Sequence, residues 1–433
     1  MKKRIFVSDA VCAFPYGHNP VGVKGFSNSL GKYFSKVVPL VSRELPHAVE
    51  MPPLTDRTFR FYYRDKIKIP RNGEKSLVNF VSTVKRHPFI RKSREIATRN
   101  LRLHMVKDPM RAEARSDWRR IFKKYAITER DTIFFPCGDY YSVRGLFHLL
   151  QNLPLTKWPA VHLHLINVME NACARGTECS TTLLRDLLAT GLVGHRIFVS
   201  TEVPAYAEKL SGLLFAEVKN FAFPPNVELE PFRDKSFFQV SAIGSGRGDK
   251  GYFRLAAIAE AYAGRFADSN VRFAVQSMNP TQCEYDAAYQ DRLEGLSNVD
   301  LLPPQLSDAQ MRDLYAASDL LLLPYCQKTY RYRGSAVMSE GYGCGRPLLV
   351  TSGTAFEGIV HRFGNGLVCN TDEEFIEAIH RYTQTSKKDL RAAAKKSRNA
   401  FFADYQKAIE SMRDRMLHAK PLPPEMKTAP TTR

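Results

Sequence analysis

Long apolar runs are missing from this 433-residue sequence. No stretch of about 18 apolar residues occurs, so we expect no membrane-spanning helix. The basic start, MKKRIFVSDAVCAF, has an apolar run that Ser8 and Asp9 interrupt, which predicts a β-strand rather than a signal peptide. The eight cysteines include no C-x-x-C pair, and Cys173 and Cys179 stand too isolated to suggest a zinc site. Reduced thiols in a cytoplasmic protein are the simplest interpretation.

Acidic residues are outnumbered, with 44 Asp and Glu against 63 Lys and Arg and a net charge of +19. Most of the excess lies between Arg57 and Arg130, where 22 basic residues face 7 acidic ones, a net charge of +15. Such a segment attracts nucleic acid, an anionic membrane surface or an acidic glycan. A solvated face is the alternative interpretation. No G-x-S-x-G motif occurs, so the sequence does not support a serine hydrolase.

Short apolar runs rich in β-branched residues alternate with helical patterns, which predicts a parallel sheet. The rhythm runs through residues 1–225, breaks at a basic and mostly helical insertion near 57–130, and restarts after the proline-containing stretch 221–232. The fold class expected is therefore α/β, with two doubly wound domains in tandem at 1–225 and 232–385. Helices are expected at 386–420, packing back toward the N-terminal domain, and a disordered tail at 421–433.

Glycines and cations share one turn in the second half. The stretch FQVSAIGSGRGDKGYF places Gly244 and Gly246 between a predicted strand and a predicted helix, with Arg247 and Lys250 inside the turn. Helix N-termini offer N–H donors to phosphate, and two cations can neutralise a diphosphate. The turn is no P-loop, because Lys250 precedes Gly251 rather than Ser or Thr. It is no dinucleotide fingerprint either, because no acidic residue ends the next predicted strand. A tight turn with exposed charges is the alternative.

A single carboxylate, Glu340, lies within the apolar helical stretch SAVMSEGYGCG, which precedes the predicted strand PLLVTS. A carboxylate beside a phosphate-binding turn suits a vicinal diol such as a ribose, because each oxygen can accept one hydroxyl hydrogen bond. A glutamate on the helix surface is the alternative. The sequence therefore predicts a nucleotide site made of the glycine turn and Glu340.

The first half offers further candidates. HLHLIN places His162 and His164 on one face of a strand, where paired histidines can bind a metal, but no further Cys or His cluster accompanies them. Core histidines are the more common case, although His164 could reach a donor sugar. Asp139 ends the strand FFPCG and could orient an acceptor hydroxyl. Gly17 and Gly22 suit a loop that lines a ligand cleft, with an ordinary βα loop as the alternative.

Three segments of the second half resemble the GT-B glycosyltransferases of the family 4 type. They are GSGRGDKG from Gly244, LSDAQMRDLYAASDLLLLP from Leu306 and EGYGCGRP from Glu340, in the family's order. The resemblance implies two Rossmann-like domains with a cleft between them, an acceptor-side domain at 1–225 and a nucleotide-sugar-binding domain at 232–385. It also implies a retaining, metal-independent transfer without cofactors, with which the absence of any D-x-D motif agrees.

Two positions depart from the family pattern. Glu340 matches the second residue of the usual Glu pair, whereas Tyr332 stands eight residues earlier in place of the first. The family also often carries Arg directly after the first glycine of the turn, where this chain has Ser245. The segment YRYRGSAV resembles a subset of the family and adds three donor-binding candidates: Arg333, Gly334 and Ser335.

The sequence therefore predicts a hexosyltransferase with a nucleotide diphosphate sugar donor and a saccharide or lipid-linked glycan acceptor. Arg247 and Lys250 would stabilise the departing diphosphate, with Gly22 among the donor-binding residues and His164 and Asp139 near the reaction. The basic segment would hold a cytoplasmic protein on the inner face of the cytoplasmic membrane. One rival is a non-catalytic binding or scaffolding subunit of the same fold. A nucleic-acid-binding protein is the other, although the segment lacks the aromatic interleaving of such proteins.

Overall fold

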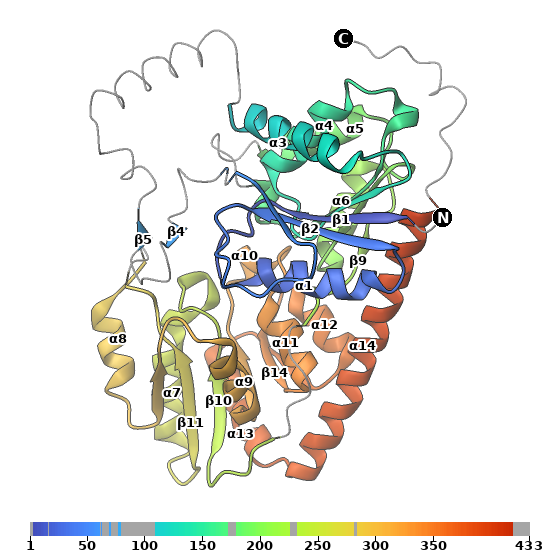
Figure 1. The fold of residues 1–433 in the computed structure, drawn as a ribbon. Helices are drawn as coiled ribbons and strands as arrows, with labels where there is room; N and C mark the ends of the chain where they lie inside the picture. The colour runs from blue at the N-terminus through green and yellow to red at the C-terminus, as the bar shows by residue number, and fades with distance from the viewer. Residues whose placement is uncertain are drawn as a thin grey trace, which may run out of the picture. The chain divides into compact units, whose positions relative to one another are not determined.

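The computed structural model describes residues 3–15, 17–60, 62, 69–70, 77–78, 109–171, 179–225, 232–280 and 284–418. The chain divides into two compact units (Figure 1). The first comprises residues 1–202, 207–220 and 408–433, and the second comprises 203–206 and 221–407. Most of the predicted basic insertion and the whole predicted tail lie outside the described residues.

The first unit is built on a parallel sheet with the strand order β3-β2-β1-β6-β7-β8-β9. Its strands are β1 (Arg4–Asp9), β2 (Lys36–Ser42), β3 (Asp56–Phe59), β6 (Thr132–Phe135), β7 (Ala160–Leu165), β8 (Ile197–Thr201) and β9 (Lys219–Asn220). Its helices are α1 (His18–Gly31), α3 (Pro109–Tyr125), α4 (Tyr140–Leu150), α5 (Cys179–Ala189) and α6 (Pro204–Leu214), of which residues 204–206 are counted with the second unit. A short antiparallel pair joins β4 (Ile69–Pro70) and β5 (Leu77–Val78). Every residue of β6, β7 and β8 is buried, as expected for strands covered on both faces.

Helix α3, the described end of the basic segment, packs closely on α4. A Cβ atom on Gly145 of α4 would lie 2.5 Å from the Ala114 Cβ, so only glycine permits this approach. The indole of Trp118 is fully buried and donates a hydrogen bond to the Ser142 carbonyl at 2.9 Å. The buried Asp117 carboxylate accepts from Arg120 at 2.8 Å. At least one basic residue of α3, Arg120, therefore neutralises a buried carboxylate within the fold.

The second unit has its own parallel sheet, with the strand order β12-β11-β10-β13-β14-β15. Its strands are β10 (Phe238–Ala242), β11 (Val271–Gln276), β12 (Val299–Leu302), β13 (Leu320–Leu323), β14 (Leu348–Thr351) and β15 (Gly366–Cys369). Its helices are α7 (Leu255–Arg265), α8 (Ala287–Glu294), α9 (Asp308–Ala317), α10 (Gln327–Tyr330), α11 (Ala336–Cys344), α12 (Ala355–Phe363) and α13 (Asp372–Thr383). Both units thus confirm the predicted doubly wound α/β architecture.

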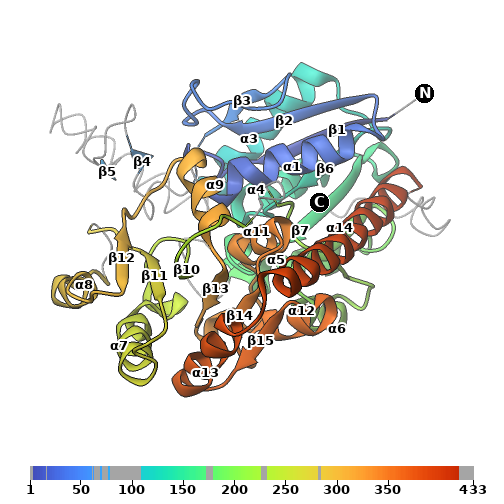
Figure 2. The same ribbon diagram turned by 90° about the horizontal axis from the view of Figure 1, so that it is seen from below.

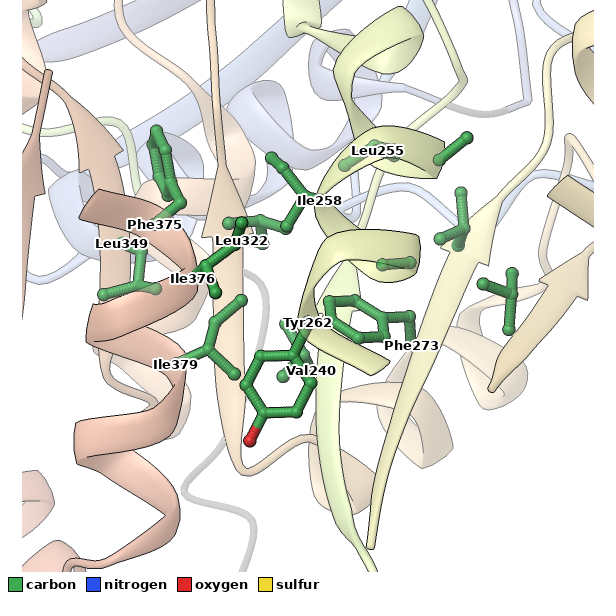
Figure 3. Packing of buried hydrophobic residues seen from close by; sticks show 14 of the residues in the cluster. Val240, Leu255, Ile258, Tyr262, Phe273, Leu322, Leu349, Phe375, Ile376 and Ile379 are labelled. Atoms are coloured by element: carbon green, nitrogen blue, oxygen red, sulfur yellow. The ribbon is translucent and has the colours of Figure 1, made fainter. Parts of the chain in front are cut away.

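Helices cover both faces of the second sheet. Figure 2 shows α7 and α13 on one side of the strands and α9 and α11 on the other. Leu255, Ile258 and Tyr262 recur along α7 at helical spacing, and all three are buried against the strands. Figure 3 shows this core, in which Phe375 and Ile379 of α13 lie against the same strands. The core fixes the strands whose carboxyl ends carry the predicted nucleotide site.

The predicted C-terminal helices are one helix, α14 (Lys387–Leu417), of 31 residues. Leu390, Ala394 and Phe401 are buried at helical spacing, and Phe401 stacks on Tyr342 of α11 with 5.7 Å between ring centroids. From residue 408 onward α14 is counted with the first unit. No helix in the described part of the chain has the length and apolar character needed to cross a membrane.

Candidate functional site

The predicted nucleotide site lies at the switch point of the second sheet. Strands β10 and β13 are parallel neighbours, but β10 leads through α7 to β11 on one side and β13 leads through α11 to β14 on the other. The connections therefore separate at the carboxyl ends of these two strands. Ligands of open α/β sheets bind at such switch points. The residues after β10 and those after β13 form the two sides of the candidate site.

The glycine turn after β10 packs directly on the end of β13. Gly244 and Gly251 have φ values of 94° and 72°, in the left-handed region that disfavours other residues. A Cβ atom on Gly251 would overlap the carbonyl oxygen of Pro324, which directly follows β13. Gly246 pairs with Met278, and a Cβ atom there would lie 2.7 Å from the Tyr252 ring. The glycines are therefore required by packing as well as by backbone conformation.

The N–H groups of this turn are used inside the protein. Gly244 donates to Gln276 Oε1 at 2.7 Å, Gly246 to the Ser277 carbonyl at 3.1 Å, and Gly248 to Glu284 Oε2 at 2.9 Å. Helix α7 begins only at Leu255, after two 3₁₀ turns. Three N–H groups of the turn are thus already bonded within the protein, and the prediction that the start of this helix offers N–H groups to phosphate stays a prediction. The turn also contributes two cations, Arg247 and Lys250.

Lys250 places its ammonium group within the site. A Cβ atom on Gly244 would lie 2.5 Å from Lys250 Nζ and 3.5 Å from a methyl carbon of Val337 in the first turn of α11. Burial and the neighbouring charge of Arg247 lower the pKa of Lys250 to about 8. Lys250 Nζ also lies 5.8 Å from the centre of the Tyr325 ring, within cation–π range. Lys250 is thus a partly desolvated cation beside the start of α11.

Arg247 is held by groups from its own turn and from the segment after β13. Its Nε and Nη2 donate to the two carboxylate oxygens of Asp249 at 2.8 and 2.9 Å, and Nη2 donates to the Tyr330 hydroxyl at 2.8 Å. Arg333 Nη1 lies 3.6 Å from the same Asp249 carboxylate. The structure therefore brings Arg247 and Arg333 to one carboxylate, and an anion that used both arginines would have to displace Asp249.

Gly334 and Ser335 lead directly into α11. Ser335 has extended backbone angles at the N-cap position, and its hydroxyl makes no capping bond to the first turn. A helix of nine residues carries a partial positive charge at this end. A methyl carbon of Val337 and Lys250 Nζ both lie within 3.5 Å of the position that a Cβ on Gly244 would take, so the first turn of α11 lies close to the ammonium group. This pairing can bind a phosphate group.

Glu340 lies one turn further along α11. Its Oε2 accepts a hydrogen bond from the Tyr315 hydroxyl of α9 at 2.5 Å. Burial raises the pKa of Glu340, whereas this hydrogen bond and the charge of Lys250 oppose the rise. Gly341, the next residue, lets α11 approach the sheet, because a Cβ atom there would lie 2.8 Å from a Leu321 methyl carbon. Glu340 is therefore a partly buried carboxylate on the helix that also carries the phosphate-binding terminus.

The first-unit candidates have structural partners. His162 Nε2 and His164 Nδ1 both lie within hydrogen-bond distance of Ser200 Oγ, at 2.8 and 3.0 Å. Burial lowers the pKa of His164 to about 3, so its ring is neutral at ordinary pH. Asp139 is the buried N-cap of α4 and accepts from the Ser142 N–H at 2.8 Å. These positions favour the interpretation as core and capping residues, and the proposed roles at a sugar stay predictions.

Gly22 lies inside α1, not in the loop that the sequence predicted, and is buried there. Only Gly17 of this pair precedes the helix, with a φ of 89° at the N-cap position. A carboxylate that the sequence reading missed, Asp9, ends β1 and accepts from the N–H groups of Val11 and Cys12 at 2.9 and 3.0 Å. Its burial raises its pKa to about 6. Asp9 therefore shapes the chain that leads from β1 to α1.

The described residues contain no group of three His, Cys, Asp or Glu side chains placed to hold a metal ion. Among the residues that sequence reasoning missed, Tyr315, Tyr330 and Asp249 contact the predicted site residues. Tyr315 belongs to the segment LSDAQMRDLYAASDLLLLP, so the motif contained it without indicating its contact with Glu340. Asp249 lies between Arg247 and Lys250 in the sequence. This closeness was the available signal that its carboxylate pairs with Arg247.

No protein-family model matches the chain, and no curated protein matches it. The chain does match solved structures of other proteins. Sucrose-phosphate synthase from Thermosynechococcus elongatus superimposes with a TM-score of 0.60 at 14% identity, over 96% of this chain and 98% of that one. The chain has the GT-B fold.

Two further solved structures match nearly the whole chain. One, trehalose-6-phosphate from E. coli bound with UDP-2-fluoro glucose, has a TM-score of 0.59 at 12% identity, and the match covers 95% of this chain and 99% of that one. The N-terminal domain of Candida albicans trehalose-6-phosphate phosphatase has a TM-score of 0.63 at 10% identity and covers 97% of each chain. At these identities the likeness establishes the fold, while the chemistry has to be argued from the site.

Proposed function

We propose that the chain is a glycosyltransferase that moves a hexose from a nucleoside diphosphate sugar to a saccharide or lipid-linked acceptor. The observation that carries the proposal is the meeting of Lys250 with the N-terminus of α11 at the β10/β13 switch point, with Glu340 on the same helix. Such a site suits a ligand that joins a diphosphate to a ribose. The structure bound with UDP-2-fluoro glucose shares the fold and supports this choice.

In this proposal the protein acts through electrostatics. Lys250, the start of α11, Arg247 and Arg333 face the diphosphate and stabilise the charge that grows as the bond to the sugar breaks. The ligand displaces Asp249 from the two arginines. We also propose that the transfer retains the anomeric configuration and needs no metal. Only the resemblance of the motifs to the GT-B family supports these two features. A non-catalytic subunit that binds the same nucleotide remains the second candidate, because Tyr332 replaces the first Glu of the family pair.

A thermal-shift screen against nucleosides, nucleoside diphosphates and nucleotide sugars tests the proposal. A ligand that binds the folded chain alone raises stability by RT ln(1 + [L]/Kd), or about 2.7 kcal/mol at a hundredfold excess over Kd. At least one nucleoside diphosphate should raise the melting temperature while its nucleoside does not. If no diphosphate in the panel raised it, the proposed site would be wrong.

Glu340→Gln should weaken the binding of a ribonucleoside diphosphate about tenfold and that of its 2′-deoxy analogue less. The carboxylate is assigned to the ribose hydroxyls, so its charge matters less once one hydroxyl is absent. Calorimetric titration of both ligands into both proteins gives the coupling between side chain and hydroxyl. Equal losses for the two ligands would make Glu340 a structural residue of α11.

The affinity for a nucleoside diphosphate should fall as the pH rises through about 8, because Lys250, whose pKa is lowered to about 8, then loses its charge. The nucleoside, which lacks phosphate, should bind equally across this range. Replacing Lys250 with Arg, which stays protonated, should flatten the profile. An identical fall in Lys250→Arg would assign the pH dependence to another group.

The described part of the basic segment allows a sharper test of membrane association, which stays a proposal. On α3, Arg120 pairs with Asp117 and Lys124 pairs with Asp56, at 2.8 and 2.9 Å. Arg119 and Lys123 are exposed and have no ion-pair partner among the described residues. The predicted residues Arg91, Lys92 and Arg94 lie outside the described residues.

Replacing both Arg119 and Lys123 with Gln should weaken binding to vesicles that contain phosphatidylserine about 30-fold at low salt, since each basic residue near such a surface contributes about 1 kcal/mol. Nucleotide affinity should not change. Sedimentation with the vesicles at two salt concentrations measures the effect, which high salt should suppress. Unchanged vesicle binding in the double variant would remove this part of α3 from the proposal.

A further inference from the structure

Tyr315 of α9 contacts the predicted ribose-binding carboxylate from the side of the protein core. Its side chain is fully buried, and its hydroxyl donates to Glu340 Oε2 at 2.5 Å. The bond to the phenol fixes Oε2, whereas Oε1 has no hydrogen-bond partner among the described residues and can accept from a ligand hydroxyl. The hydrogen bond therefore determines the orientation in which Glu340 presents its free oxygen.

The position of Tyr315 is itself fixed by a buried arginine. Arg346, in the turn between α11 and β14, is fully buried and donates from Nε to the Tyr315 carbonyl at 2.7 Å. Its guanidinium also lies 4.0 Å from the centre of the Phe232 ring. Arg346 thus ties the end of α9 to the end of α11, and Tyr315 carries that constraint to Glu340.

We propose that Tyr315 is a positioning residue for Glu340. Its hydroxyl holds the Glu340 carboxylate ionised and oriented for a hydroxyl of the bound nucleotide. The proposal rests on the proposed function, because it assigns Glu340 to the ribose. It differs from a packing role in what it predicts for the charge of Glu340. Among the described residues, the groups that act on that carboxylate are Tyr315 and Asp308 from α9 and Lys250 from the glycine turn.

The sign of the expected pH effect follows from these neighbours. Burial and the charge of Asp308 raise the pKa of Glu340. The Tyr315 hydrogen bond and the charge of Lys250 lower it, and the hydrogen bond has the larger effect of the two. Replacing Tyr315 with Phe removes the hydroxyl and leaves the burial, so the pKa of Glu340 should rise further. The variant should then lose the ionised carboxylate at a higher pH than the wild type. Relative to the wild type, its affinity for a ribonucleotide should fall as the pH is lowered and recover as the pH is raised.

The test compares wild type with Tyr315→Phe across mildly acidic to mildly alkaline pH. The probes are uridine, adenosine and guanosine diphosphates, of which the one that binds is taken forward with its 2′,3′-dideoxy analogue. We expect Tyr315→Phe to bind the ribonucleotide about tenfold more weakly at acidic pH and nearly as well as wild type at alkaline pH. The dideoxy analogue, which has no hydroxyl for Glu340, should bind both proteins equally at every pH.

Tyr342→Phe is the matched control, because Tyr342 is a buried tyrosine of α11 whose hydroxyl donates to the Gly364 carbonyl at 3.1 Å and not to Glu340. It should lower the melting temperature, because it too removes a hydrogen bond of a buried tyrosine, yet keep the wild-type pH profile. In a Glu340→Gln background the change at Tyr315 should add almost nothing to the loss of ribonucleotide affinity.

Equal losses for the ribonucleotide and its dideoxy analogue, or a wild-type pH profile in Tyr315→Phe, would overturn the inference and leave Tyr315 a packing residue. The failure of the proposed function looks different. In that case the wild-type protein would bind none of the three diphosphates, whatever the residue at position 315.

Discussion

Replacing Lys250 with Met is expected to weaken the binding of a nucleoside diphosphate about 10- to 100-fold, the range that a charge-assisted hydrogen bond of about 1.5–3 kcal/mol produces. Methionine keeps the apolar stem and removes the charge. The nucleoside should bind variant and wild type equally. Arg247→Ala should have a smaller effect, because a ligand gains Arg247 only after displacing Asp249 from it.

Lys250→Met should leave the ligand-free protein as stable as the wild type or more stable. Burial lowers the pKa of Lys250, and among the described residues no carboxylate lies within ion-pair distance of its ammonium group. The protein therefore holds a desolvated charge whose partner would be the ligand. Lys388→Met, at an exposed position of α14, is the control and should change neither property. Weak diphosphate binding together with lower stability in Lys250→Met would indicate a structural lysine.

Gly251→Ala is expected to destabilise the second unit by about 3 kcal/mol or more. Two causes combine, since the residue has a φ of 72° and a Cβ atom would overlap the Pro324 carbonyl oxygen. The turn would have to move away from β13, and Arg247 and Lys250 would move with it. Diphosphate affinity should therefore fall even at temperatures where the variant is folded. Thermal unfolding followed by circular dichroism measures the first effect and calorimetric titration the second.

Gly264→Ala provides the comparison for this prediction. Gly264 lies within α7, and a Cβ atom there would meet no atom within 4 Å. Alanine should stabilise the helix by about 0.5–1 kcal/mol, because it removes backbone freedom from the unfolded chain without a clash. If both alanine variants unfolded at the wild-type temperature, the close packing of the turn on β13 would not be a feature of the protein.

Local sequence patterns were sufficient for the fold because most strands of both sheets are continuous apolar runs. The runs TIFF and LLLL became β6 and β13, with every residue buried. Three short strands of the two parallel sheets were missed: β3, β12 and β15. Each has only four residues and includes positions that are not fully buried, such as Asp300 in β12 and Gly366 in β15. Their pairing with a neighbouring strand stabilises them, and the sequence alone does not show that neighbour.

Local patterns were less informative about the loop before α1. The stretch YGHNPVGVKGF contains three glycines and a proline, which predicted a loop, yet α1 begins at His18. Pro20 lies in the first turn of α1, where a missing N–H group costs little. This proline was the available signal for a helix start. Gly22 lies buried within the helix.

For the site, the sequence supplied the residues and the structure supplied their partners. Arg247, Lys250 and Glu340 lie where the motif spacing placed them, at one end of the β10/β13 pair. Their contacts could not be predicted, because Tyr315 is 25 residues from Glu340 and Tyr330 is 83 residues from Arg247. Such contacts arise from tertiary packing. They determine which oxygen of Glu340 is free and which cation is already paired.

The most direct test of the central claim is the release of nucleoside diphosphate from a panel of nucleotide sugars, measured with and without saccharide and lipid-linked acceptors. The account predicts that one nucleotide sugar is cleaved, that an acceptor accelerates the release, and that Lys250→Met abolishes it. Tight binding of a nucleotide sugar without cleavage, under every acceptor condition, would contradict the enzymatic claim and favour a non-catalytic protein of the same fold.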